Sequence, residues 1–140
     1  MPGYRETFRR MVSAEMCDIY GHMNVAYYVA AISDSFFSLM TEVGLGKSAV
    51  DRHRVGLVAV NMNIDYTAEV GLGDVIRMQG AIVSAAGKKM TCRFHLYDVS
   101  SGKQAMTATV LYVCMDLDSR RSRAIPGHLL EAALAAAVGE

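Results

Sequence analysis

Residues Asn24-Val-Ala-Tyr-Tyr-Val-Ala-Ala-Ile-Ser-Asp-Ser-Phe-Phe-Ser-Leu-Met-Thr-Glu-Val-Gly44 are the stretch that decides the fold. Their apolar side chains recur every three or four residues, which predicts a helix of about five turns with one broad apolar face. The residues on that face are Val25, Tyr28, Val29, Ile32, Phe36, Leu39, Met40 and Val43. Asn24 is a favoured N-cap, and a glycine such as Gly44 commonly ends a helix. Such a helix must bury its apolar face against a second layer.

That second layer is predicted by the change to a period of two after the helix. Four ranges are typical of strands, and residues 4–12 can form an opening strand; the four are 58–66, 75–84, 90–97 and 105–117. The first of these is expected to be half-buried, and the short turns between them favour antiparallel neighbours. Residues 47–54 lack a period and indicate a loop or a short irregular helix, while Pro126 opens a terminal helix. The sequence therefore predicts one α+β domain over residues 1–140.

Composition excludes several classes of protein. The chain has 140 residues, of which 52% are hydrophobic, and a formal net charge of zero, so nothing at whole-chain level favours nucleic acid. Its three cysteines (Cys17, Cys92 and Cys114) are unpatterned and indicate buried free thiols. The charged N-terminus lacks a signal-peptide core, and no apolar run approaches the roughly 20 residues of a membrane span. A cytoplasmic protein without a membrane anchor is expected.

The loop before the helix carries the chemistry. Asp18-Ile-Tyr-Gly-His-Met-Asn24 places a carboxylate next to a helix N-terminus, whose free N–H groups and positive dipole end attract developing negative charge. An acid or nucleophile beside an oxyanion site is what hydrolysis of an acyl compound requires. No Gly-x-Ser-x-Gly elbow is present, and the four histidines show no metal-ligand spacing.

At this point the sequence resembles a known family. Asp18-x-x-Gly21-His22-x-Asn24, followed by Tyr28 inside a long apolar helix, is similar to the hotdog-fold acyl-CoA thioesterases, and within them to the 4-hydroxybenzoyl-CoA thioesterase branch. Ile64-Asp-Tyr-Thr67, Gly73-Asp74 and Tyr97-Asp-Val-Ser-Ser-Gly102 agree in order. The resemblance implies a hotdog fold, a long central helix wrapped by a curved antiparallel sheet of about five strands. It also implies hydrolysis of acyl-CoA to free acid and CoA without metal or cofactor, in a homodimer or homotetramer with sites at the dimer interface.

The resemblance also implies roles for the loop residues. Asp18 corresponds to the family's nucleophile or general base, and both routes remain open. The backbone N–H of Val25 corresponds to the donor that polarises the thioester carbonyl. Gly21, Asn24 and Tyr28 are expected to support the site through backbone conformation, helix capping and the pocket wall. His22 could position Asp18, contact the acyl chain or simply pack.

Two further questions concern the substrate. CoA carries phosphates, which lysine and arginine bind at exposed rims. The candidates are Arg52, Arg54, Lys88, Lys89 and Arg93. The acyl group, whether aromatic, fatty or betainyl-like, is left open. The alternatives to a thioesterase are a hotdog hydratase or dehydratase and a non-catalytic acyl-thioester-binding protein.

Overall fold

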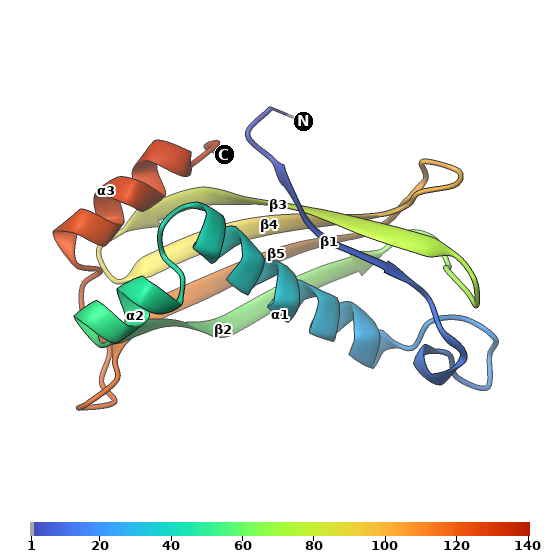
Figure 1. Cartoon of the computed structure of the whole chain (residues 1–140), viewed down its shortest axis with the longest axis horizontal. Coiled ribbons are helices and arrows are strands. Elements are labelled where there is room, and N and C mark those ends of the chain that lie inside the picture. Colours follow the sequence, from blue (N-terminus) through green and yellow to red (C-terminus); the bar gives the residue numbers. More distant parts are fainter. Residues whose placement is uncertain (1) are drawn as a thin grey trace.

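Helix α1 (Val25–Glu42) lies across one face of a curved, five-stranded antiparallel sheet (Figure 1). The structure, a computed structural model, describes residues 2–140. The other elements, in chain order, are β1 (Arg5–Met11), the short 3₁₀ helix η1 (Ala14–Met16), α2 (Lys47–His53), β2 (Val55–Tyr66), β3 (Val75–Ala86), β4 (Lys89–Asp98), β5 (Gln104–Asp116) and α3 (Gly127–Ala136). The predicted α+β hotdog architecture is confirmed.

Helix α1 begins and ends where the sequence predicts. Asn24 has extended backbone angles (φ −72°, ψ 150°), and its side chain accepts a hydrogen bond from the Ala26 N–H. At the other end Gly44 has φ +87°, a left-handed conformation that glycine adopts without strain. The Leu45 N–H then donates to the Met40 carbonyl over 2.7 Å, which closes the last turn. The chain reverses at this point, and residues predicted as a loop or a short helix form α2.

The order of strands differs in one place from the predicted arrangement. The sheet runs β1-β3-β4-β5-β2, so β2 and β3 are consecutive in the chain but are not neighbours. Crossing β5 and β4 requires three strand spacings, about 14 Å. The eight residues 67–74 can span up to about 26 Å, so they are long enough for this crossing. The prediction that every short connection joins adjacent strands is confirmed for β3–β4 and β4–β5 and is wrong for β2–β3.

The core lies between α1 and the inner face of the sheet. Ile32, Phe36 and Leu39 are at most 4% exposed. The Phe36 ring stacks on the Tyr112 ring of β5, with centroids 4.0 Å apart and planes at 15°. Burying side chains of this size contributes roughly 1.5–3 kcal/mol each. This contact fixes α1 over β5 and thereby sets the position of both helix ends.

Some residues assigned to the apolar face of α1 are not covered. Val25 and Val29 are 53% and 39% exposed. Strand β2, which was expected to be half-buried, forms one of the two edges of the sheet, the other being β1. Its Val58 and Val60 are 40% and 56% exposed. Unpaired strand edges with apolar side chains usually find a partner strand.

The three cysteines are free thiols, as predicted. Cys92 and Cys114 are buried, and Cys17 is half-buried. Burial raises the pKa of Cys92 to about 12, so this thiol is inert at neutral pH.

Within residues 2–140, no helix is long and apolar enough to cross a membrane.

Candidate active site

The loop that carries Asp18 is held in place by backbone hydrogen bonds. The Gly21 N–H donates to the Asp18 carbonyl and the Asp18 N–H to the His22 carbonyl, over 3.0 and 3.1 Å. Gly21 has φ +82°, a left-handed conformation that agrees with the expected role in backbone conformation. The Met23 N–H donates to the Val70 carbonyl over 2.8 Å, which ties the loop to the segment before β3. The carboxylate therefore sits on a fixed support.

The Asp18 carboxylate accepts two hydrogen bonds. Oδ2 accepts from Nδ2 of Asn24 over 3.0 Å, and Oδ1 accepts from the Tyr20 N–H over 2.9 Å. These bonds stabilise the anion and lower the pKa of Asp18, with Asn24 as the larger cause. The side chain is 23% exposed, so a substrate can reach it. Asp18 is therefore an accessible carboxylate anion at neutral pH.

Asn24 has two roles. Its Oδ1 accepts from the Ala26 N–H over 3.0 Å, which caps α1, while its Nδ2 donates to Asp18. The capping role was predicted, but the bond to Asp18 was not. One amide thus fixes the distance between the carboxylate and the helix N-terminus.

His22 lies between two carboxylates. Its Nδ1 is 3.1 Å from Oε1 of Glu69, and its Nε2 is 3.9 Å from Oδ1 of Asp18. The sequence offered no signal for Glu69, which follows β2 in an irregular segment and reaches the site only through the chain fold. Of the three roles left open for His22, this arrangement agrees with the positioning of Asp18.

A cavity of about 410 Å³ opens beside the first turn of α1. Its lining includes Val25, Tyr28, Tyr66 and the His22–Glu69 pair. Asp18 is not part of the lining, but its carboxylate lies 3.9 Å from Nε2 of His22, which is part of it. The Val25 N–H is the first N–H group of α1, and within residues 2–140 it has no hydrogen-bond acceptor. A carbonyl oxygen in this cavity can therefore accept a bond from a helix N-terminus.

The two tyrosines form one wall of this cavity. Their rings meet edge to face, with centroids 5.0 Å apart and planes at 85°. Burial raises the pKa of Tyr28, and it also raises that of Tyr66, so both phenols stay neutral. The expectation that Tyr28 is a pocket wall agrees with this position.

The basic residues proposed to bind CoA phosphates do not gather around Asp18 in this chain. Arg54 and Lys88 lie at the other end of the sheet, where Arg54 pairs with Asp118 over 3.0 Å and Lys88 donates to Ser122. Arg52 and Lys89 lie on the same end, in α2 and at the start of β4. The twelve residues of β2 separate these two ends by about 35 Å.

Arg93 lies on neither end. It points from the middle of β4 to the sheet face opposite α1, where Nε donates to the Thr109 hydroxyl over 3.4 Å.

Among residues 2–140, no three histidine, cysteine or acidic side chains are close enough to share a metal ion.

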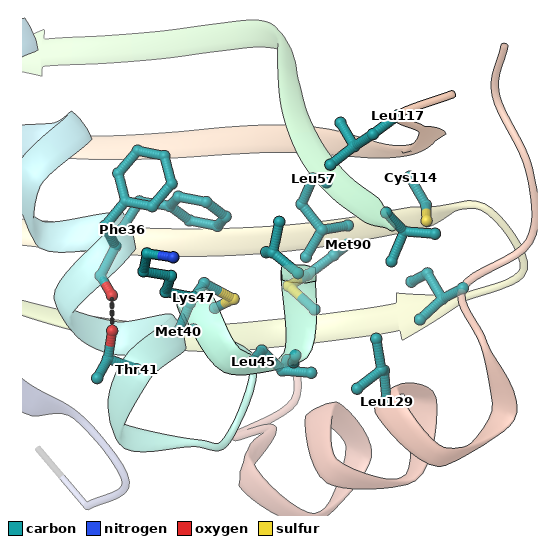
Figure 2. A pocket seen from close by; sticks show the side chains of 17 residues that line it. Phe36, Met40, Thr41, Leu45, Lys47, Leu57, Met90, Cys114, Leu117 and Leu129 are labelled. Carbon is teal, nitrogen blue, oxygen red and sulfur yellow. Dashed lines mark hydrogen bonds between the residues drawn. The ribbon is translucent and has the colours of Figure 1, made fainter. Parts of the chain in front are cut away.

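A second cavity, of about 420 Å³, lies at the C-terminal end of α1 (Figure 2). It is lined by seventeen residues from α1, α2, α3 and the sheet, nearly all of them apolar. The sequence gave no indication of this cavity, because its walls come from segments far apart in the chain.

Comparison with known proteins agrees with this architecture. A family model described as the thioesterase-like superfamily matches residues 12–133. The chain is 25% identical over 118 residues to the long-chain acyl-CoA thioesterase FadM of Escherichia coli strain K12, which covers 81% of this chain and 86% of FadM.

Two solved structures share the fold. The probable thioesterase YbaW of Escherichia coli superposes with a TM-score of 0.79 at 22% identity, covering 91% of this chain and 96% of YbaW. A hypothetical protein of Staphylococcus aureus, solved in complex with CoA, superposes with a TM-score of 0.83 at 23% identity, covering 94% and 83%.

Proposed function

Because this chain belongs to the thioesterase-like superfamily, we propose that it hydrolyses acyl-CoA thioesters to a free acid and CoA at the cavity beside the N-terminus of α1. One observation carries the proposal. Asn24, which caps α1 and precedes Val25, donates a hydrogen bond to the anionic Asp18 carboxylate, and the Val25 N–H has no acceptor within residues 2–140. FadM, similar over most of its length, is named as a long-chain acyl-CoA thioesterase, which supports the same reaction here.

The arrangement supplies two parts of the reaction. The thioester carbonyl accepts a hydrogen bond from the Val25 N–H, and the helix dipole stabilises the charge that develops on its oxygen. In one route Asp18 attacks the carbonyl carbon, the C–S bond breaks with loss of CoA thiolate, and water hydrolyses the acyl–Asp18 anhydride to the free acid. In the other route Asp18 takes a proton from water as the water attacks the carbonyl carbon, and the C–S bond breaks to release CoA, which carries that proton away. The bonds from Asn24 and Tyr20 lower the pKa of Asp18, so the carboxylate is ionised at neutral pH, as both routes require.

The proposed enzyme is a homodimer paired through β2. This strand has β5 on one side only, and its free edge carries the exposed Val58 and Val60. On α1, Val25, Val29 and Phe37 are also exposed apolar side chains. Antiparallel pairing of β2 with a second copy covers the free edge and closes a two-fold dimer. This pairing also places the Tyr66 end of β2 in one copy beside the Val55 end of β2 in the other copy.

A CoA-release assay tests the reaction. Butanoyl-, dodecanoyl-, benzoyl- and betainyl-CoA are offered to the wild-type protein, to Asp18→Asn and to Glu131→Gln, a matched change of an exposed carboxylate on α3. We expect release by the wild type and by Glu131→Gln, and a loss of at least about 100-fold in Asp18→Asn. CoA bound but not released by the wild type would support a binding protein instead.

A further inference from the structure

We propose that the apolar cavity at the C-terminal end of α1 holds the acyl chain of the substrate, that it is built for a straight hydrocarbon chain, and that it serves Asp18 of the partner copy. The inference rests on the proposed acyl-CoA hydrolysis by a β2-paired dimer. It adds the substrate class and the residues that select it.

The lining of the cavity defines the chemistry of its occupant. Of the seventeen side chains only Thr41 and Lys47 are polar, and both already have partners. The Thr41 hydroxyl donates to the Phe37 carbonyl over 2.8 Å, and Nζ of Lys47 pairs with Asp51 over 2.7 Å. Because no polar side chain of the lining lacks a partner, the cavity fits a hydrocarbon. A betainyl group would lack a carboxylate to balance its charge, and a hydroxylated aromatic acyl group would lack a partner for its hydroxyl.

Small residues of α2 and β2 leave space in the cavity. Ala49 of α2 and Gly56 of β2 face the cavity with little or no side chain. The floor is closed by Met90, Cys114 and Leu129, each at most 6% exposed, with Leu129 contributed by α3 (Figure 2). Phe37 borders the cavity and is 63% exposed, so it marks the mouth. A cavity of about 420 Å³ holds on the order of a dozen groups the size of a water molecule or methylene, at about 30 Å³ each.

Within one chain this cavity cannot serve the Asp18 site. The eighteen residues of α1 separate the Val25 N–H from the far end of the helix by about 27 Å. Ile32 and Phe36 fill the inner face between the two ends, at 0% and 4% exposure. An acyl chain bound at Val25 would have to pass through this packed core.

In the β2-paired dimer the same two sites become neighbours. Helix α1 runs antiparallel to β2, since Tyr28 meets Tyr66 at one end and Phe37 shares the cavity with Leu57 at the other. When two β2 strands pair antiparallel, the Leu57 end of one copy lies beside the Tyr66 end of the other. The mouth at Phe37 of one copy therefore faces the Val25 N–H of its partner.

The first test fills the cavity. Ala49→Phe places a ring in it, and Ser48→Phe makes the same change at an exposed position of the same helix. Each methylene excluded from an apolar site costs roughly fourfold in affinity. We expect the kcat/KM ratio of dodecanoyl-CoA to butanoyl-CoA to fall at least about tenfold in Ala49→Phe and to stay at the wild-type value in Ser48→Phe. An equal ratio in both variants would overturn the inference.

Binding of dodecanoate, measured by calorimetry, separates this inference from the proposed reaction. We expect dodecanoate to bind the wild type and Ser48→Phe and to lose at least about tenfold in affinity in Ala49→Phe. Dodecanoate binding without CoA release from any acyl-CoA would support the cavity assignment and contradict the proposed function. CoA release with unchanged dodecanoate binding in Ala49→Phe would do the reverse. If Ala49→Phe melts early, Leu129→Phe fills the cavity from the floor.

The second test asks which copy supplies the cavity. A heterodimer of one Asp18→Asn protomer and one Ala49→Phe protomer is isolated with two affinity tags. If the cavity serves the partner, one of the two sites joins Asp18 to an open cavity, and we expect about half the wild-type rate on dodecanoyl-CoA. If the cavity serves its own chain, the heterodimer is as slow as its parents, and the assignment across the dimer is overturned.

Discussion

The two ends of α1 border cavities of nearly equal size, about 410 and 420 Å³, with opposite chemistry. The N-terminal cavity has a free helix N–H, a histidine between two carboxylates and two phenols. The C-terminal cavity has only paired polar groups and an apolar floor. The difference follows from the two ends of the helix. The first N–H groups of α1 need acceptors, whereas at its other end the chain reverses at Gly44 and small residues leave room.

This difference suggests a division of labour. In the proposed reaction, the polar end activates the thioester and the apolar end accepts the hydrocarbon part of the substrate. A single chain keeps them a helix length apart, so only an assembly can use both on one substrate.

Removing the helix N–H has the largest expected effect. Val25 is the first residue of α1, a position where proline is tolerated, and Asn24 already has the extended backbone that a following proline requires. Val25→Pro should lower kcat about 100- to 1,000-fold, as loss of one oxyanion donor does. Val25→Ala keeps the N–H and serves as the control. Similar rates for the two variants, measured with dodecanoyl-CoA, would contradict the assignment of this donor.

Charging the β2 edge should separate the two cavities. Val60→Lys places a lysine on each of the two β2 edges that are proposed to pair, which disfavours their pairing. We expect the dimer to dissociate, as measured by analytical ultracentrifugation, and CoA release to fall at least about tenfold in parallel. Leu134→Lys charges another exposed apolar position, on α3, and should change neither. A monomeric Val60→Lys with full activity would show that the polar end works alone.

The pH profile tests the bond between Asn24 and Asp18. This bond lowers the pKa of Asp18, so its loss moves the acid limb of kcat/KM to higher pH. Asn24→Ser removes the amide donor but keeps a good helix cap, so the melting temperature should change little. Asn24→Ala loses both the donor to Asp18 and the helix cap. Its free energy of unfolding should fall by about 0.5–2 kcal/mol, and its melting temperature should fall with it. An unmoved acid limb in both variants would exclude Asp18 as the group that titrates there.

The smallest expected effect is that of Glu69. Its side chain is 80% exposed, and exposed ion pairs contribute about 0–1 kcal/mol. Glu69→Gln should therefore lower kcat less than about tenfold, through a less well-held His22. Glu42→Gln, at the other end of α1, should leave kcat unchanged. A loss as large as that of Asp18→Asn would instead give Glu69 a direct part in the reaction.

Much of the fold could be predicted because its signals are local. The period of α1, its cap at Asn24 and its end at Gly44 all lie within one stretch of chain. The strands were found in the same way. The place of β2 could not be predicted, because eight residues suffice for a neighbour or for a crossing, and only packing chooses between them. The exposure of Val58 and Val60 follows from that choice.

The candidate site divides along the same line. Asp18, Gly21 and Asn24 share one loop, so their spacing carries their geometry. Tyr66 joins the site from the C-terminal end of β2, and Glu69 from the segment after it. Although Tyr66 belongs to the Ile64–Thr67 motif, nothing in the sequence indicates that either residue reaches the site. The basic candidates Arg54 and Lys88 were chosen by charge alone. In the fold they lie at the opposite end of the sheet from Asp18.

The sequence by itself determined the helix, the reactive loop and the resemblance to a family, because these depend on periodicity and on residues a few positions apart. The tertiary structure decided which strand lies at the free edge, which side of α1 stays uncovered and where a cavity opens. These features depend on how distant segments share a limited volume. A linear pattern records only which surfaces are apolar; packing decides which of them remain for a partner or a substrate.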